Sequence, residues 1–131
     1  MIFDFEKPKG HPMTAPSKLI LDFIYLHEKE RAAQVYLTQP LGGGRVVDYT
    51  WAQTLDQARR MAAHLQSRGM EPGARIAILS KNSAHFIMAE LAIWMAGGTT
   101  VAIFPTESGE TIRYVLDHSE ASFLFVGKLD T

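Results

Sequence analysis

The pattern of apolar and polar residues begins with a helical period. Over residues 14–30 the apolar side chains recur on one face, which predicts an amphipathic helix that begins near Pro16 and Ser17. That face comprises Leu19, Ile20, Phe23, Ile24 and, more weakly, His27. The charged residues at the end of this segment are expected to point to solvent.

The pattern changes over residues 33–50, where two runs are rich in β-branched and aromatic residues. Pro40 and three consecutive glycines separate these runs. Such runs around a glycine-rich centre predict a β-hairpin. Its turn is expected to consist of Gly42, Gly43 and Gly44.

Residues 49–69 carry the clearest helical pattern in the chain. Its apolar face comprises Trp51, Leu55, Ala58, Ala62 and Leu65. Thr50 and Gln53 have the spacing of a capping box, in which each side chain satisfies a free backbone N–H at the helix start. Gly69 is expected to end the helix in the left-handed conformation.

The second half alternates apolar runs with helical stretches. The runs are residues 75–80, 99–105 and 121–126, and the helical patterns 82–97 and 107–120 lie between them. Strands that are apolar on both faces imply a parallel sheet covered on both sides, joined by right-handed crossovers. The predicted fold class is α/β: a parallel sheet of about three strands in a β-α-β-α-β unit, preceded by the N-terminal helix and the hairpin.

The strands are expected to be centred on Ile78, Ala102 and Leu124. The predicted core comprises Trp51, Leu55, Ala62, Ile78, Leu91, Val101, Ile103 and Phe125.

Length and composition narrow the class of protein. A chain of 131 residues suits one domain spanning 1–131, and its 47% apolar and 21% charged residues suit a folded one. A net charge of −1 argues against nucleic-acid binding. The sequence has no cysteine, which excludes thiol catalysis and fits a reducing compartment. With no signal-peptide pattern and no transmembrane segment, a cytoplasmic protein is expected.

The glycine- and threonine-rich stretch 94–110 raises the question of a phosphate loop. Such a loop must run from a strand to a helix, whereas Gly97 and Gly98 follow a helix and precede a strand. We interpret them as a helix cap and a site of close helix-to-sheet packing. Glycine motifs for dinucleotides or nucleoside triphosphates do not occur in the sequence.

The next segment, 104–110, does run from a strand to a helix. It places Glu107 and Glu110 where they would repel a phosphate, and Thr106 or Ser108 is expected to act as the helix cap.

The sequence does not favour a metal site, a catalytic nucleophile, a phosphate-accepting site or a flavin site. No two histidines have the i, i+4 spacing of a metal-binding helix, and no nucleophile elbow occurs. The histidines are His11, His27, His64, His85 and His118. The loop 79–85 has neither the acidic pair of a phosphate-accepting domain nor the loop of a flavin site. The sequence therefore assigns no catalytic, cofactor-binding or metal residue.

The helix predicted at 82–97 is apolar around its whole circumference, with Glu90 and His85 as its main polar side chains. A sheet of three strands would cover one side of it. The apolar residues that could not all face that sheet are Phe86, Met88, Trp94 and Met95. We therefore predict that the isolated chain associates with itself, most simply as a homodimer.

The stretch from Tyr49 to Thr106 resembles the N-terminal part of the adenylate-forming enzymes. It has an aromatic residue and Thr before a helix, then "GMEPGARIA", "NS", an alanine-rich helix ending in "AG", and "VAIFPT". The continuation "SGETIRYVLDHSEASFLFVGKLD" resembles the long-chain and bubblegum-like branch of the fatty-acid CoA ligases more closely than it resembles the short-chain ligases. The likeness covers the chain from about Leu21. Ala74 and Ala102 depart from the Asp and Pro frequent there, both in scaffold motifs.

The resemblance implies that the chain is an N-terminal subdomain fragment of a larger ligase. An intact enzyme would use ATP, Mg²⁺ and CoA to convert a fatty acid to its adenylate and then to acyl-CoA. The family's phosphate loop and catalytic lysine would lie beyond Thr131, so the chain alone is expected to be inactive, with the rest of the ligase as its partner. The alternative is a stand-alone, non-catalytic α/β binding or interaction module.

Overall fold

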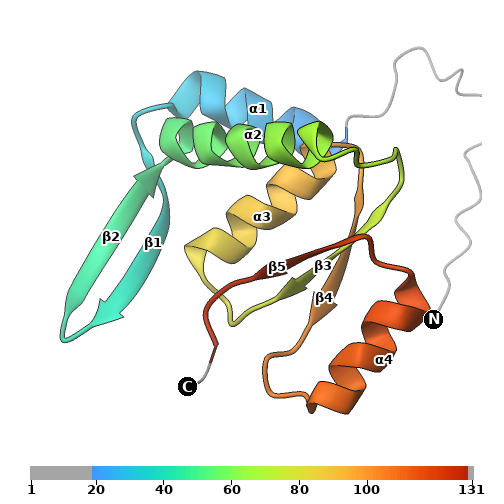
Figure 1. Ribbon diagram of the computed structural model, residues 1–131. Helices are drawn as coiled ribbons and strands as arrows, with labels where there is room; N and C mark the ends of the chain where they lie inside the picture. The colour runs from blue at the N-terminus through green and yellow to red at the C-terminus, as the bar shows by residue number, and fades with distance from the viewer. Residues whose placement is uncertain (1–18, 130–131) are drawn as a thin grey trace, which may run out of the picture.

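The computed structural model describes residues 19–129 and contains four helices and five strands in that range (Figure 1). A helix and a hairpin precede a β-α-β-α-β unit, so the predicted fold class is confirmed. The elements in chain order are α1 (Ile20–Arg31), β1 (Val35–Gly42), β2 (Arg45–Thr50), α2 (Trp51–Ser67), β3 (Arg75–Leu79), α3 (Ala84–Met95), β4 (Thr99–Ile103), α4 (Gly109–Ser119) and β5 (Phe123–Val126).

The parallel sheet has the order β4-β3-β5, so the first strand in sequence lies in the middle. Ile78 is paired with Ala102 on one side and with Phe125 on the other. The predicted strand centres Ile78, Ala102 and Leu124 lie within β3, β4 and β5. In Figure 1, α3 and α4 lie on opposite sides of this sheet. This is the arrangement that right-handed crossovers produce.

The hairpin forms a separate two-stranded antiparallel sheet. Gly42 is paired with Arg45, so Gly43 and Gly44 are the two turn residues, with φ of +63° and +77°. Positive φ at both turn positions matches the twist of the strands and is strained for any residue with a Cβ. The predicted glycine turn is confirmed at Gly43 and Gly44, whereas Gly42 is the last residue of β1.

Helix α1 begins at Ile20; Pro16 and Ser17 lie outside the described residues. Leu21 and Ile24 pack inward against α2 and α3, while Ile20 and Phe23 are exposed. The predicted apolar face was therefore only partly right. Both faces of α1 carry apolar residues. The face that packs inward is determined by contact with α2, and the periodicity of the sequence does not identify it.

Helix α2 follows the sequence closely. The Gln53 N–H donates to Thr50 Oγ1 over 3.1 Å, and the Thr50 N–H donates to Gln53 Oε1 over 2.9 Å, so the capping box is confirmed. Gly69 ends the helix at a φ of +81°, as predicted. The inner face of α2, including Leu55 and Ala58, is buried.

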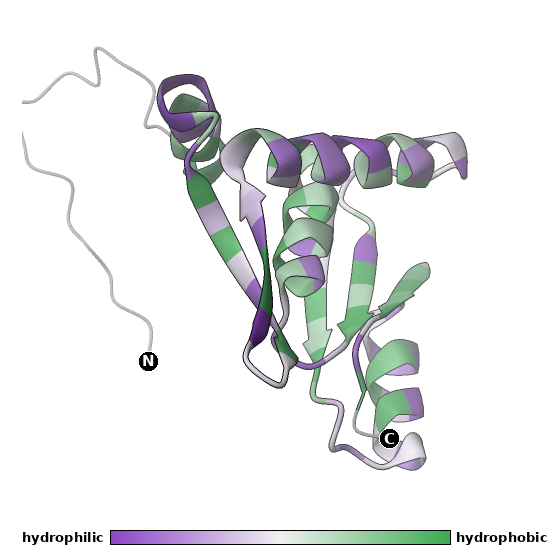
Figure 2. Cartoon of the chain, turned by 90° about the vertical axis from the view of Figure 1, so that its left-hand side faces the viewer, coloured by the Kyte–Doolittle hydropathy of each residue, from purple (hydrophilic) through white to green (hydrophobic). Residues whose placement is uncertain are grey.

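The core lies around α3. Figure 2 shows that α3 and the parallel strands are mainly hydrophobic, whereas α2 carries many hydrophilic residues. Of the predicted core residues, Trp51, Val101 and Phe125 are half-buried. The others are buried, namely Leu55, Ala62, Ile78, Leu91 and Ile103.

The expectation that α3 lacks cover within the chain is wrong. Helix α3 is not left without cover, because α2, α1 and the hairpin strand β1 pack on the side away from the sheet. The predicted cover on both sides of the sheet is present, with α3 on one side and α4 on the other, but it is uneven. Leu124 and Val126 of β5 remain 39% and 60% exposed, since α4 packs mainly on β4. Among the described residues, no helix has the length and apolar content needed to cross a bilayer.

Candidate functional site

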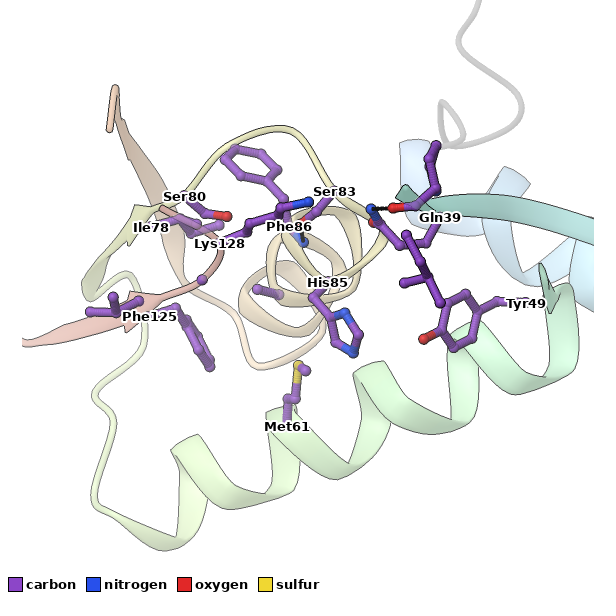
Figure 3. Close-up of a pocket in the computed structure, with 15 residues that line it drawn as sticks. Gln39, Tyr49, Met61, Ile78, Ser80, Ser83, His85, Phe86, Phe125 and Lys128 are labelled. Carbon is purple, nitrogen blue, oxygen red and sulfur yellow. Dashed lines mark hydrogen bonds between the residues drawn. The ribbon is translucent and has the colours of Figure 1, made fainter. Parts of the chain in front are cut away.

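A cavity of about 600 Å³ opens at the carboxyl ends of β3 and β5 (Figure 3). Ligands of open parallel sheets gather at this edge, and the volume lies in the range of small-molecule sites. The hairpin, α2, the first turns of α3 and the end of β5 form its walls.

The lining is mainly apolar and carries basic but no acidic side chains. Met61, Ile78 and Phe125 form part of the apolar wall, and His85 and Lys128 are the two basic residues. This cavity can accept an apolar group. Because its lining has no acidic side chain, a negatively charged group bound there would not be repelled by the lining residues.

Gln39 on β1 fixes the hairpin wall against α3. Its Oε1 accepts a hydrogen bond from the Ala84 N–H over 2.8 Å, at the first residue of α3. The Ser83 Oγ accepts from the Phe86 N–H over 3.1 Å and caps the same helix. The Tyr49 ring meets the His85 ring edge-on at 5.9 Å between centroids. Two hairpin side chains thus contact the first turn of α3: Gln39 accepts a hydrogen bond from its backbone, and Tyr49 packs on His85.

The serines of the cavity are already engaged in structural hydrogen bonds. The buried Ser80 donates its Oγ–H to the Lys81 carbonyl over 2.7 Å, and Ser83 serves as the helix cap. A Cβ at Gly127 would overlap the Ser80 side chain, so only glycine fits there without movement. In the part of the chain that the structure describes, neither serine is hydrogen-bonded to His85. The arrangement suits binding, and it lacks the activated nucleophile that covalent catalysis requires.

The glycine pair after α3 has the structural role that its order predicted. Gly97 has a φ of +86° and donates its N–H to Trp94 O over 3.0 Å, while the Gly98 N–H donates to Ile93 O over 2.8 Å. These two bonds form a Schellman motif. A Cβ on Gly98 would come within 3.0 Å of the Met70 side chain. Both the predicted helix cap and the predicted close packing are confirmed.

The segment before α4 is also structural. The Thr111 N–H donates to Ser108 Oγ over 3.1 Å, so Ser108 is the cap and Thr106 is not. Glu110 lies in the first turn of α4, where its negative charge interacts favourably with the positive end of the helix dipole. The same charge would repel an anion bound at this end of the helix.

The histidines do not come together. His85 lines the cavity, His27 packs on Trp51 at 5.2 Å between ring centroids, and His64 and His118 are exposed. His11 lies outside the described residues. Within residues 19–129, no three histidine, aspartate or glutamate side chains are grouped so that they could hold a metal ion.

Sequence reasoning missed the cavity itself. The rule that ligands collect at the carboxyl edge did direct attention to residues 79–85, which include Ser80, Ser83 and His85. No sequence pattern indicated that Gln39 and Tyr49 of the hairpin would form one wall of the cavity. Its docking on α3 depends on tertiary packing.

Comparison with known proteins adds independent evidence. Residues 26–131 match the family described as AMP-binding enzyme. The long-chain-fatty-acid–CoA ligase FadD15 of Mycobacterium bovis is 35% identical over 102 residues, which are 78% of this chain and 17% of that protein. The peroxisomal acetate/butyrate–CoA ligase AAE7 of Arabidopsis thaliana is 32% identical over 99 residues, 74% of this chain and 17% of that protein.

A solved structure shows the same fold. The fatty acid AMP ligase from Legionella pneumophila superimposes with a TM-score of 0.74 at 23% identity, over 81% of this chain and 19% of that one. The chain thus spans under a fifth of the length of each of these three proteins.

Proposed function

The chain belongs to the AMP-binding enzyme family, and from that premise we propose that it forms the opening scaffold of an ATP-dependent fatty acid–CoA ligase. The whole enzyme would join ATP to a fatty acid, release pyrophosphate and transfer the acyl group to CoA. The supporting observation is the β3-α3-β4 unit with its Gly97–Gly98 junction, which lies inside the matched residues. The remainder of the ligase would then be the partner of this segment.

The residues described here do not fit a nucleoside triphosphate. Gly97 and Gly98 lie at the carboxyl end of α3, where helix carbonyls and not N–H groups are exposed. The first turn of α4 carries Glu110, and its cap Ser108 is already bonded. The proposal therefore assigns ATP, Mg²⁺ and CoA to other parts of the enzyme and holds that this chain alone is inactive.

We further propose that the acyl group of the substrate is that of a fatty acid. The two relatives of similar identity are named for long-chain fatty acids in one case and for acetate and butyrate in the other. The likeness of 108–130 to long-chain ligases favours a fatty acid. A cytoplasmic location is also proposed, supported by the lack of cysteine in all 131 residues.

Exchange of radiolabelled pyrophosphate into ATP tests the catalytic part of the proposal. The purified chain of 131 residues should show no exchange that depends on a fatty acid, while an intact long-chain ligase assayed in parallel should show it. Exchange by the chain alone would refute its proposed inactivity.

A non-catalytic binding module is the second candidate, favoured by the open cavity of about 600 Å³. The gene sequence past codon 131 separates the two candidates. A downstream phosphate loop supports the ligase scaffold, and a stop codon supports the module.

A further inference from the structure

The hairpin is anchored to the rest of the molecule at its base. Trp51 donates its backbone N–H to Gln34 O over 3.0 Å, and its ring stacks on Tyr36 at 3.8 Å between centroids. From this base the hairpin extends away from α1 and α2 to its turn (Figure 1). Next to the base, between Val35 and Leu37, the pairing of β1 with β2 is irregular, and strands bend at such irregularities.

Beyond the base, few contacts hold the hairpin against α3. Within the described residues, the bond from the Ala84 N–H to Gln39 Oε1 is the one hydrogen bond that joins these elements (Figure 3). Tyr49 adds the edge-on ring contact with His85. The structure describes every residue of β1 and β2, and none of them is buried. A segment with so little buried surface opens more readily than a buried core does.

Two cavities meet at this contact. Gln39, Pro40 and Ser83 line the cavity of about 600 Å³ and also line a second cavity of about 250 Å³. The rest of the second lining comes from β1, the loop before α3 and the first turn of α3, namely Leu37, Thr38, Asn82, Ala84 and Ile87. The shared residues therefore separate the two cavities.

We propose that the outer hairpin, residues 37–49, is a movable wall and that the bond between Gln39 and Ala84 holds it closed. Bending beside the base would move these strands away from α3 and join the two cavities into one cleft. The released Ala84 N–H would then bond to water, which keeps the cost of opening small. The inference concerns contacts within the chain, so it goes beyond the proposed function and does not depend on it.

The distance between the hairpin and the rest of the molecule tests this proposal. Because the sequence has no cysteine, Val46→Cys and Glu71→Cys, both at exposed positions, can carry a pair of spin labels for pulsed electron paramagnetic resonance. Gln39→Leu removes the acceptor of the Ala84 N–H and should raise the ratio of open to closed molecules by about tenfold. Gln39→Glu keeps an acceptor, and its distances should match those of the wild type.

A second label pair, Glu71→Cys with Arg113→Cys, lies outside the hairpin at exposed positions. Its distances should be the same in the wild type and in both Gln39 variants. If they broaden in Gln39→Leu, the substitution loosens the whole fold and the proposal fails. The proposal also fails if the distances from Val46 are equal in Gln39→Leu and Gln39→Glu.

Access to the cavity is tested with the dye anilinonaphthalene sulfonate, an apolar anion that suits a mainly apolar lining without acidic residues. Ala84→Pro removes the donor of the bond and leaves the lining of the larger cavity unchanged. Ala84 is the first residue of α3, a position at which helices accept proline. A ligand that needs the open form binds in proportion to its population, so the dye should bind Ala84→Pro about tenfold more tightly than the wild type. Equal affinities would show that the hairpin does not control the cavity.

Discussion

Ala84 donates its backbone N–H to the side-chain oxygen of Gln39 over 2.8 Å, a contact between residues 45 positions apart. A hairpin side chain thereby satisfies one of the free N–H groups at the start of α3. This bond joins the hairpin to the helix that carries His85 and the floor of the cavity.

Replacing Gln39 with Leu should lower the free energy of unfolding by about 1–3 kcal/mol, because the part-buried Ala84 N–H loses its acceptor. Gln39→Glu keeps an acceptor at the same place and should retain most of the stability. Both variants lose the bond from Gln39 Nε2 to the Pro40 carbonyl, so their difference isolates the helix contact. Denaturant melts that show equal stability for the two variants would contradict this role.

Leu91→Ala should cost about 2–5 kcal/mol in unfolding free energy. Leu91 is 3% exposed and lies in the cluster that joins α3 to α2 and α1, where a cavity cannot readily collapse. The half-exposed Leu41 offers a control, and Leu41→Ala should change stability by less than about 0.5 kcal/mol. Urea titration measures both variants, and a neutral Leu91→Ala would place α3 outside the core.

Glu120→Gly should stabilise the protein by about 0.5–1 kcal/mol. Glu120 has a φ of +56°, a left-handed conformation that costs a residue with a Cβ about 1–2 kcal/mol, partly offset by the chain entropy of glycine. Gly97→Ala is the reverse case at the end of α3 and should destabilise. Thermal melts of both variants check the sign, and a destabilising Glu120→Gly would show that the Glu120 side chain has a stabilising role of its own.

Glu90→Gln should raise the stability at pH 7 and lose this advantage in acid. Burial on α3 raises the pKa of Glu90 above its ordinary value. The folded state therefore binds a proton more tightly than the unfolded state, so stability falls as pH rises from the unfolded pKa through the folded one. Melting temperatures of wild type and variant at about pH 4, near the ordinary pKa of a glutamate side chain, and at about pH 7 measure the change.

Glu71→Gln, on an exposed turn, is the control for this pH effect. Its melting temperature should follow that of the wild type at both pH values. If Glu90→Gln also follows the wild type, burial does not penalise the Glu90 carboxylate.

Sequence patterns predicted correctly those features that depend only on residues a few positions apart. The capping box of Thr50 and Gln53 and the terminating turn at Gly97 depend on neighbours in the sequence, and both are present as expected. The order of strands and helices also follows from periodicity, because apolar runs alternate with helical stretches.

Tertiary docking decided what the sequence left open. Helix α1 could have turned Phe23 inward, yet the residues it half-buries are Leu21 and Ile24, because α2 and α3 meet that side. The cover of α3 was missed for the same reason, since α2 and the hairpin were not expected to pack on it. The cavity depends on that docking, so only its residues at the end of β3 could be anticipated.

The position of β3 between two strands that follow it in sequence has a consequence for synthesis on the ribosome. The nascent chain makes β3 before either neighbour, so the sheet grows outward from its first strand. One side of β3 is satisfied when β4 emerges, but the other stays open until Phe123–Val126 has been made. A chain halted within α4 would therefore expose the apolar edge at Ile76 and Ile78, and such an intermediate is a natural client for chaperones that recognise unpaired strands.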